Sequence, residues 1–255
     1  MALVMKTSTV RSLHRWLGLI FSLVVLSSSL SGVIHTIMAH KQSPPPSVHP
    51  SGSGIVAADI RTGAQEALER LGPDFGRVGA INLRMIGGEP WYQIYGPESV
   101  PAYVRATDGR VDPAMDANYA AQIASSFLGG AAVRQTDYLT EFNHEYVNIF
   151  RILPVFRFDV DDGAGTRVYV STTTGTVTRH TDNEKQFEAN VFFLFHKFGF
   201  IADRTIRDAV VVSAMIGISL VALAGVALFF MTRPRRRTSP VSYTHLRAHE
   251  TRHDL

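Results

Sequence analysis

The sequence predicts an α+β membrane protein in which two transmembrane helices flank an extracytoplasmic domain of two α-plus-antiparallel-β repeats. Two observations carry this prediction. Residues 16–39 and 209–232 are apolar stretches of 24 residues each, and neither contains Asp, Glu, Lys or Arg, although 18% of the 255 residues are charged. The segment between these stretches contains the same order of helical and strand-like patterns twice.

Both apolar stretches have the length and the flanking charges of membrane-spanning helices. At about 1.5 Å per residue each reaches ~36 Å, more than the roughly 30 Å of a hydrocarbon core. Each stretch has basic residues without acidic neighbours at the end that lies nearer its chain terminus. They are Lys6, Arg11, Arg15, Arg233, Arg235, Arg236 and Arg237. The positive-inside rule places these ends in the cytoplasm. We therefore expect a bacterial inner-membrane protein with residues 1–15 and 233–238 cytoplasmic, both termini inside and the central domain periplasmic.

The first stretch is interpreted as a retained anchor and not as a cleaved signal peptide. The apolar run of a signal peptide has about 7–15 residues, and residues 16–39 exceed that length. The sequence that ends at Ala39 also lacks the small-residue pattern of a cleavage site.

Charge and cysteine content exclude several classes of function. The net charge of the whole chain is +3. Because the basic flanks account for more than this excess, the segment between the spans is acidic and nucleic acid is not an expected partner. The chain contains no cysteine, which excludes disulfides, iron–sulfur clusters and covalent Cys-x-x-Cys-His haem attachment.

The last residues, 239–255, are similar to translated sequencing-adaptor read-through and show no apolar periodicity. Three histidines with helical spacing, His245, His249 and His253, look like a metal cluster, but we expect an artefactual or disordered tail there. The natural protein is then expected to continue beyond this point with further helices, so that the chain is a fragment.

The central segment begins with a linker rich in Pro, Ser and Gly, residues 40–54. The first repeat, residues 55–113, is predicted to contain one helix and three strands followed by a hairpin turn at Asp108-Gly109. The expected bounds are 59–71 for the helix and 77–85, 90–95 and 100–106 for the strands.

The second repeat, residues 114–183, restarts with a predicted helix and four strands. The expected bounds are 116–128 for the helix and 133–139, 152–160, 167–171 and 176–179 for the strands. The motif Tyr-Val-x4-Gly-x-Val begins at Tyr103 and again at Tyr169. An aromatic interfacial segment, 184–208, leads to the second span.

These patterns resemble a known family. The order of helix, strands and a Tyr-Val-x4-Gly-x-Val ending is similar to the PepSY domain. The N-terminal Leu13-His14-Arg15-Trp16-Leu17-Gly18 and the later Phe195-His196-Lys197-Phe198-Gly199 resemble helices of PepSY-associated transmembrane proteins. The resemblance covers residues 10–237. It implies a role in iron or siderophore handling, since some members are haem-containing ferric-siderophore reductases.

Haem ligation is the sharpest site hypothesis. A membrane b-type haem needs one or two imidazoles at matching depth. His35 lies in the first span near its outer end, and His196 precedes the second span, so we predict that His35 and His196 hold an outer haem iron within a wall of phenylalanines. His14 lies about 31 Å from His35 along a helix and is the candidate for an inner haem, with a ligand from absent helices or another copy. His14 beside Arg15 and Trp16 is equally typical of an interfacial anchor.

Two functions remain open on the sequence alone. The first is a b-haem membrane reductase that moves electrons to a periplasmic ferric chelate. The second is a membrane-anchored module that binds a periplasmic protein or peptidase partner without a cofactor, through strand edges around 92–103 and 155–170. Small residues in both spans are expected to permit close packing between the two helices or in a homo-oligomer. They are Ser27 to Ser31 with Gly32 in the first span, and Ala214, Gly217, Ala222 and Gly225 in the second.

One further motif, Asp159-Val-Asp161-Asp162-Gly163, is similar to the start of a calcium loop. No Glu follows at the position that such a loop requires, so we expect turn chemistry there.

Overall fold

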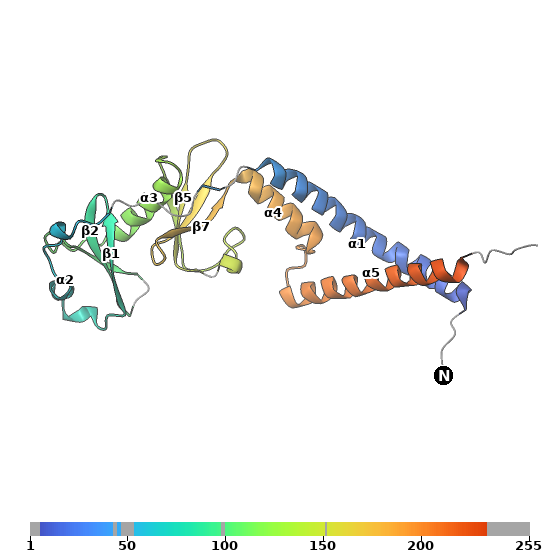
Figure 1. Ribbon diagram of the computed structural model, residues 1–255. Helices are drawn as coiled ribbons and strands as arrows, with labels where there is room; N and C mark the ends of the chain where they lie inside the picture. The colour runs from blue at the N-terminus through green and yellow to red at the C-terminus, as the bar shows by residue number, and fades with distance from the viewer. Residues whose placement is uncertain (1–5, 43–44, 47–53, 98–99, 151, 234–255) are drawn as a thin grey trace, which may run out of the picture. The chain divides into compact units, whose positions relative to one another are not determined.

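The computed structural model describes residues 6–42, 45–46, 54–97, 100–150 and 152–233 (Figure 1). It divides into two compact units, one of residues 1–30 with 195–255 and one of residues 31–194. The class is α+β, with antiparallel sheets between two long apolar helices, as predicted. Most of the predicted linker and the predicted artefactual tail with its three histidines lie outside the described residues.

The two long helices belong mainly to the first unit. Helix α1 spans Thr7–Lys41 and helix α5 spans Arg204–Thr232, and both are long and apolar enough to cross a membrane. Asp203 caps α5, because its carboxylate accepts a hydrogen bond from the Ile206 amide at 2.9 Å. The predicted spans 16–39 and 209–232 therefore lie within single helices.

Small residues bring α1 and α5 close together within this unit. A Cβ atom on Gly217 would lie 2.0 Å from the ring of Phe21, and one on Gly225 would lie 3.1 Å from the His14 ring. Gly18 of α1 in turn lies against Val221. The small residues predicted for the second span are thus part of a contact within the chain. A Cβ atom on Gly32, predicted for the first span, would meet no other atom within 4 Å.

The second unit begins with a small sheet covered by one helix. Helix α2 spans Ala64–Leu71, and the strands are β1 (Ala80–Ile86), β2 (Glu89–Tyr95) and β3 (Ala102–Arg105), antiparallel in the order β1-β2-β3. The helix is shorter than the predicted 59–71. The amides of Arg61 and Thr62 both donate to the carbonyl of Ala106, which ties these residues to the end of β3 and delays the helix to residue 64.

The next helix and sheet repeat this order with one additional strand. Helix α3 (Met115–Phe127) precedes β4 (Arg134–Leu139), β5 (Val155–Asp159), β6 (Arg167–Ser171) and β7 (Thr176–Thr181), in the spatial order β4-β5-β6-β7. All pairs are antiparallel.

The repeated motif adopts the same turn in both sheets. Gly109 and Gly175 have φ angles of +74° and +68°, a conformation that glycine adopts at little steric cost. Each donates its amide hydrogen to a carbonyl four residues earlier at 2.9 Å. Val104 then pairs with Val111, and Val170 pairs with Val177. The two halves therefore share this turn in structure as well as in sequence.

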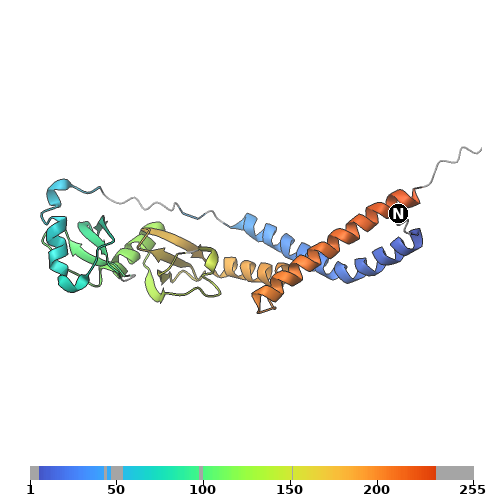
Figure 2. The ribbon, with the colours of Figure 1, turned by 90° about the horizontal axis from the view of Figure 1, so that it is seen from below.

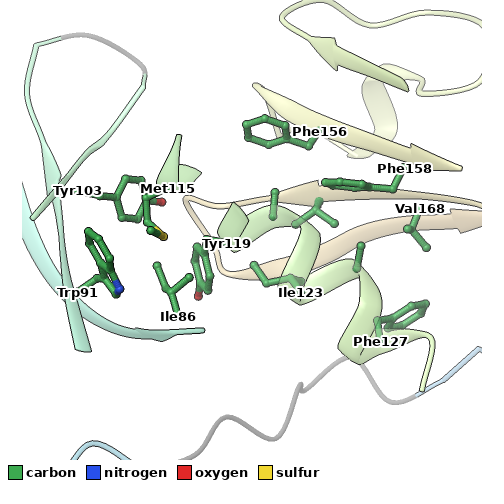
Figure 3. Packing of buried hydrophobic residues seen from close by; sticks show 13 residues of the cluster. Ile86, Trp91, Tyr103, Met115, Tyr119, Ile123, Phe127, Phe156, Phe158 and Val168 are labelled. Atoms are coloured by element: carbon green, nitrogen blue, oxygen red, sulfur yellow. The ribbon is translucent and has the colours of Figure 1, made fainter. Parts of the chain in front are cut away.

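The two sheets share one hydrophobic core. Figures 1 and 2 show α3 between them, and Figure 3 shows its buried side chains in contact with both. Ile123 of α3 is 2% exposed and belongs to the same cluster as Trp91 of β2 and Val168 of β6. A smaller cluster under α2, with Ala67 and Ile94, serves the first sheet alone.

The aromatic segment after β7 forms a separate helix, α4 (Asn183–His196). It ends where Phe198 takes a positive φ of 52°, and α5 begins only at Arg204. Residues 187–201 are therefore not one continuous extension of the second span.

Candidate functional site

The most unusual polar contact joins the outer part of α1 to α4 within the second unit. His35 Nδ1 lies 2.5 Å from Glu188 Oε1. The side-chain amide of Gln42 donates to the other oxygen of the same carboxylate. The ring of Phe192, one turn beyond Glu188, lies 5.5 Å from the His35 ring. The two helices thus meet around a carboxylate.

Burial explains why this carboxylate is bound from two sides. Glu188 is 8% exposed, and a buried carboxylate is stable only when hydrogen-bond donors replace its water. Both donors come from the end of α1 and the residue that follows it, so Glu188 fixes the pairing of α4 with that end of the helix.

The contact also defines the tautomer of His35. An ionised carboxylate only accepts hydrogen bonds, so Nδ1 is the donor, and the neutral ring then carries its lone pair on Nε2. The His35 side chain is 52% exposed. Histidines that bind metals through Nε2 are commonly oriented by a carboxylate in this way.

His14 shows a similar arrangement in the first unit. Its Nδ1 lies 3.0 Å from the carbonyl oxygen of Val221 in α5. A carbonyl also only accepts, so Nδ1 is again the donor, and in the neutral ring Nε2 carries the lone pair. The side chain next in sequence, Arg15, lies over the Trp16 ring at 5.7 Å, which matches an interfacial anchor. His14 therefore has features of both interpretations.

His196 is the half-buried last residue of α4. It belongs to the first unit, whereas His35 belongs to the second, so the predicted pair stays a prediction. Glu188, Phe192 and His196 follow one another at intervals of four residues and occupy one face of α4. Of the predicted phenylalanine wall, Phe193, Phe195 and Phe200 are exposed.

His35 and His14, each taken singly, offer the kind of nitrogen ligand that b-type haem requires. Each of His35 and His14 has Nδ1 engaged and Nε2 unprotonated in the neutral ring, the form that binds haem iron. Among the described residues, no group of three or more His, Cys, Asp or Glu lies together. A one- or two-imidazole site is the type that these side chains suit.

Sequence reasoning missed Glu188 and Gln42. A signal was present for Glu188, because it is the one acidic residue in a run dominated by phenylalanines, Phe187 to Phe195. A carboxylate in such a segment needs a partner. Nothing in the sequence pointed to Gln42, which lies at the beginning of the predicted linker.

A second polar network lies in the core of the central domain. The Tyr103 hydroxyl donates to Asp116 at 2.7 Å and accepts from Gln93 at 2.8 Å, and Gln93 also donates to the Thr172 carbonyl at 3.0 Å. Burial raises the pKa of Asp116, although hydrogen bonds from Tyr103 and Thr172 oppose the shift. Burial raises the pKa of Tyr103 as well. Because Thr172 follows β6, this network joins the two sheets.

The strand edges predicted as a docking surface are wrong in part. Of the strands in the predicted ranges, β2, β5 and β6 are interior, and only β3 is an edge strand; the other edge strands are β1, β4 and β7. Tyr92, Tyr103, Val155 and Val170 are buried. The addition of β7 to the second sheet covers the edge that β6 was expected to offer.

The calcium-like segment forms a turn, as predicted. Asp162 accepts hydrogen bonds from the amides of Ala164 and Thr166, and Asp159 is bound by Arg157 at 3.0 Å. Two of the three carboxylates of this segment, those of Asp159 and Asp162, are thus bound by the protein itself.

Comparison with known proteins returned no family model, no curated protein and no solved structure that matches this chain. The PepSY resemblance therefore rests on the sequence motifs alone.

Proposed function

We propose that this protein is a PepSY-associated inner-membrane protein that holds b-type haem and moves electrons to a periplasmic ferric chelate. The observation that carries the proposal is the His35–Glu188 contact of 2.5 Å. It occupies Nδ1 of an exposed imidazole in the outer part of an apolar helix, so that Nε2 of the neutral ring is the atom that would bind iron.

The chain's own residues have separate roles in this proposal. His35 would bind the haem iron through Nε2, and Glu188 holds the imidazole ring and makes it a stronger ligand by accepting a hydrogen bond from Nδ1. His196 is the proposed second ligand, and His14 serves an inner haem. The exposed phenylalanines of α4 would shield a bound haem from water. Haem, when bound, supplies one-electron chemistry that no side chain here provides.

Topology gives the proposal its direction. With both basic flanks in the cytoplasm, His14 lies near the inner surface and His35 near the outer one. A haem held by His35 would then lie on the same side of the membrane as the central domain, the side on which a periplasmic ferric chelate would be reduced.

A reduced-minus-oxidised visible spectrum of the detergent-extracted chain, made under haem-replete expression, tests the proposal. We expect a Soret and an α-band, and we expect His35→Ala to lose the signal of the outer haem. His40→Ala is the matched control, since His40 is an exposed histidine of the same helix, and it should retain the bands. A folded protein without any haem band would refute the proposal.

Glu188→Gln gives a second readout that does not depend on loss of haem. The amide accepts a weaker hydrogen bond from Nδ1, so the imidazole donates less to iron and the midpoint potential should rise. An unchanged potential would remove Glu188 from the proposed role.

The second candidate is a membrane-anchored periplasmic module that binds a protein partner without a cofactor. It is favoured by the self-contained packing of the two sheets, whose core includes none of the three candidate ligands. A haem-free but stably folded extract would favour this function over the first.

A further inference from the structure

Residues 142–149, in the connection between β4 and β5, combine a buried anchor with exposed apolar side chains. Tyr146 is the anchor and is fully buried. The Tyr146 ring stacks on Tyr169 of β6 at 4.8 Å, and its hydroxyl lies 2.9 Å from Thr178 of β7. Asn143 closes a turn by accepting the amide hydrogens of Glu145 and Tyr146. These contacts hold residues 143–146 against the second sheet.

Three large apolar side chains of this loop nevertheless face outward. Ile149 is 73% exposed, Phe142 is 41% exposed and Val147 is 37% exposed. Scattered exposed apolar residues are normal, but several on one ordered loop are typical of a contact surface.

Hydrogen bonds place this loop at the end of the sheet from which α4 departs. Glu145 binds Arg167 at 2.8 Å, and Arg167 binds Asn183, the first residue of α4, at 2.8 Å. Glu188 follows five residues later, about 8 Å along the helix, and meets α1 at His35 and the following Gln42.

This geometry sets the height of the loop above the bilayer. The apolar run of α1 ends at Ala39, and the headgroup layer extends roughly 5–8 Å beyond the hydrocarbon core. The base of the loop is therefore about one layer of headgroups from the end of the span. Phe187, on the first turns of α4, is 59% exposed at the same level, as expected for an aromatic side chain at a membrane interface.

We infer that residues 142–149 contact the outer surface of the same bilayer that the chain spans, with Ile149 and Phe142 inserted among the lipid headgroups. Lipid is the occupant that the placement favours, because hydrogen bonds connect the loop to the beginning of α4, and α4 in turn to the end of α1. The inference rests on the membrane placement of α1 and α5 and does not depend on haem.

The absence of cysteine allows a direct test. A nitroxide label is attached to Ile149→Cys in the full-length protein, which is reconstituted into phosphatidylethanolamine–phosphatidylglycerol vesicles. Power saturation of the label's electron paramagnetic resonance signal then compares its collisions with oxygen and with a water-soluble nickel chelate. We expect the oxygen-to-nickel ratio to be several-fold higher at residue 149 than at the control. Val111→Cys is a suitable control, since Val111 is 42% exposed and lies beyond β3, in the sheet that Figure 1 draws on the far side of α3 from α4.

Phe142→Cys repeats the measurement at a second position, should the first variant fail to fold. A label at 149 as accessible to nickel as the one at 111 overturns the inference. A label shielded from both oxygen and nickel also overturns it, because that result indicates a protein contact.

Discussion

At the scale of single residues, two buried carboxylates hold different parts of the chain together. Glu188 joins α4 to α1, and Asp116 joins α3 to the Tyr103 hydroxyl. Each is bound by donors from another segment, which is the condition under which a buried carboxylate is tolerated. Removing one partner of such a contact is more damaging than replacing it with a neutral group of the same shape.

Asp116 should make stability depend on pH in a direction opposite to that of an ordinary salt-bridged carboxylate. Burial raises its pKa in the folded state above the ordinary value for aspartate, so the folded protein binds the proton more tightly than the unfolded chain. The free energy of unfolding therefore falls as pH rises from about 4 through the raised pKa, and it is flat above that value. Asp116→Asn keeps the acceptor for Tyr103 and should remove this fall.

Thermal unfolding of the detergent-solubilised protein between about pH 4 and pH 7 measures this effect. Asp137→Asn, on an exposed position of β4, is the control and should retain the wild-type profile. Asp116→Ala leaves the Tyr103 hydroxyl without its acceptor and should cost about 1–3 kcal/mol. Parallel pH profiles for wild type and Asp116→Asn would show that Asp116 does not cause the dependence.

At this scale the candidate site was only partly predictable. His35 was recognisable because a histidine inside an apolar stretch is unusual. Its partner Glu188 lies 153 residues away in sequence, and a pairing over that distance is decided by the fold. Local patterns therefore identify the ligand candidate but not the residue that orients it.

At the scale of elements, glycines determine how closely α1 and α5 approach. Gly217→Ala would place a methyl group 2.0 Å from the Phe21 ring, so that ring must leave its position. We expect a loss of about 1–3 kcal/mol, the usual effect of adding volume to a packed contact. The melting temperature in mild detergent should fall accordingly.

Gly32→Ala is the matched control for this experiment. Gly32 is also a glycine of an apolar helix, but a Cβ atom added to it would meet no other atom within 4 Å. Alanine has the higher helix propensity, so Gly32→Ala should be neutral or slightly stabilising. Equal effects of the two substitutions would mean that helix propensity, and not packing, decides.

Elements were predicted more reliably than their ends. Strand β6 matches its predicted bounds because it is a buried run between turn residues, with Val168, Tyr169 and Val170 all fully buried. Helix α2 begins later than predicted because Arg61 and Thr62 bond to Ala106, which is distant in sequence. Periodicity reports which face is buried, whereas the ends of a helix depend on such tertiary contacts.

At the scale of the whole molecule, the internal repeat does not produce two independent domains. Both halves have the same order of elements, yet α3 contributes side chains to a cluster that includes Trp91 of the first sheet and Val168 of the second. The network from Gln93 to Thr172 crosses the same junction. A repeat is visible in sequence, but the sharing of its core is not, because no local pattern shows which sheet a helix covers.

The shared core predicts that the two sheets unfold together. Ile123→Ala removes a side chain that is 2% exposed and should cost about 2–5 kcal/mol. If the sheets form one cooperative unit, hydrogen exchange should accelerate by the same factor in β2 and in β6. Leu68→Ala, in the cluster that serves only the first sheet, should also accelerate exchange in β6. Faster exchange in β2 alone in that variant would establish that each half opens separately, since the second sheet would then keep its stability without the first.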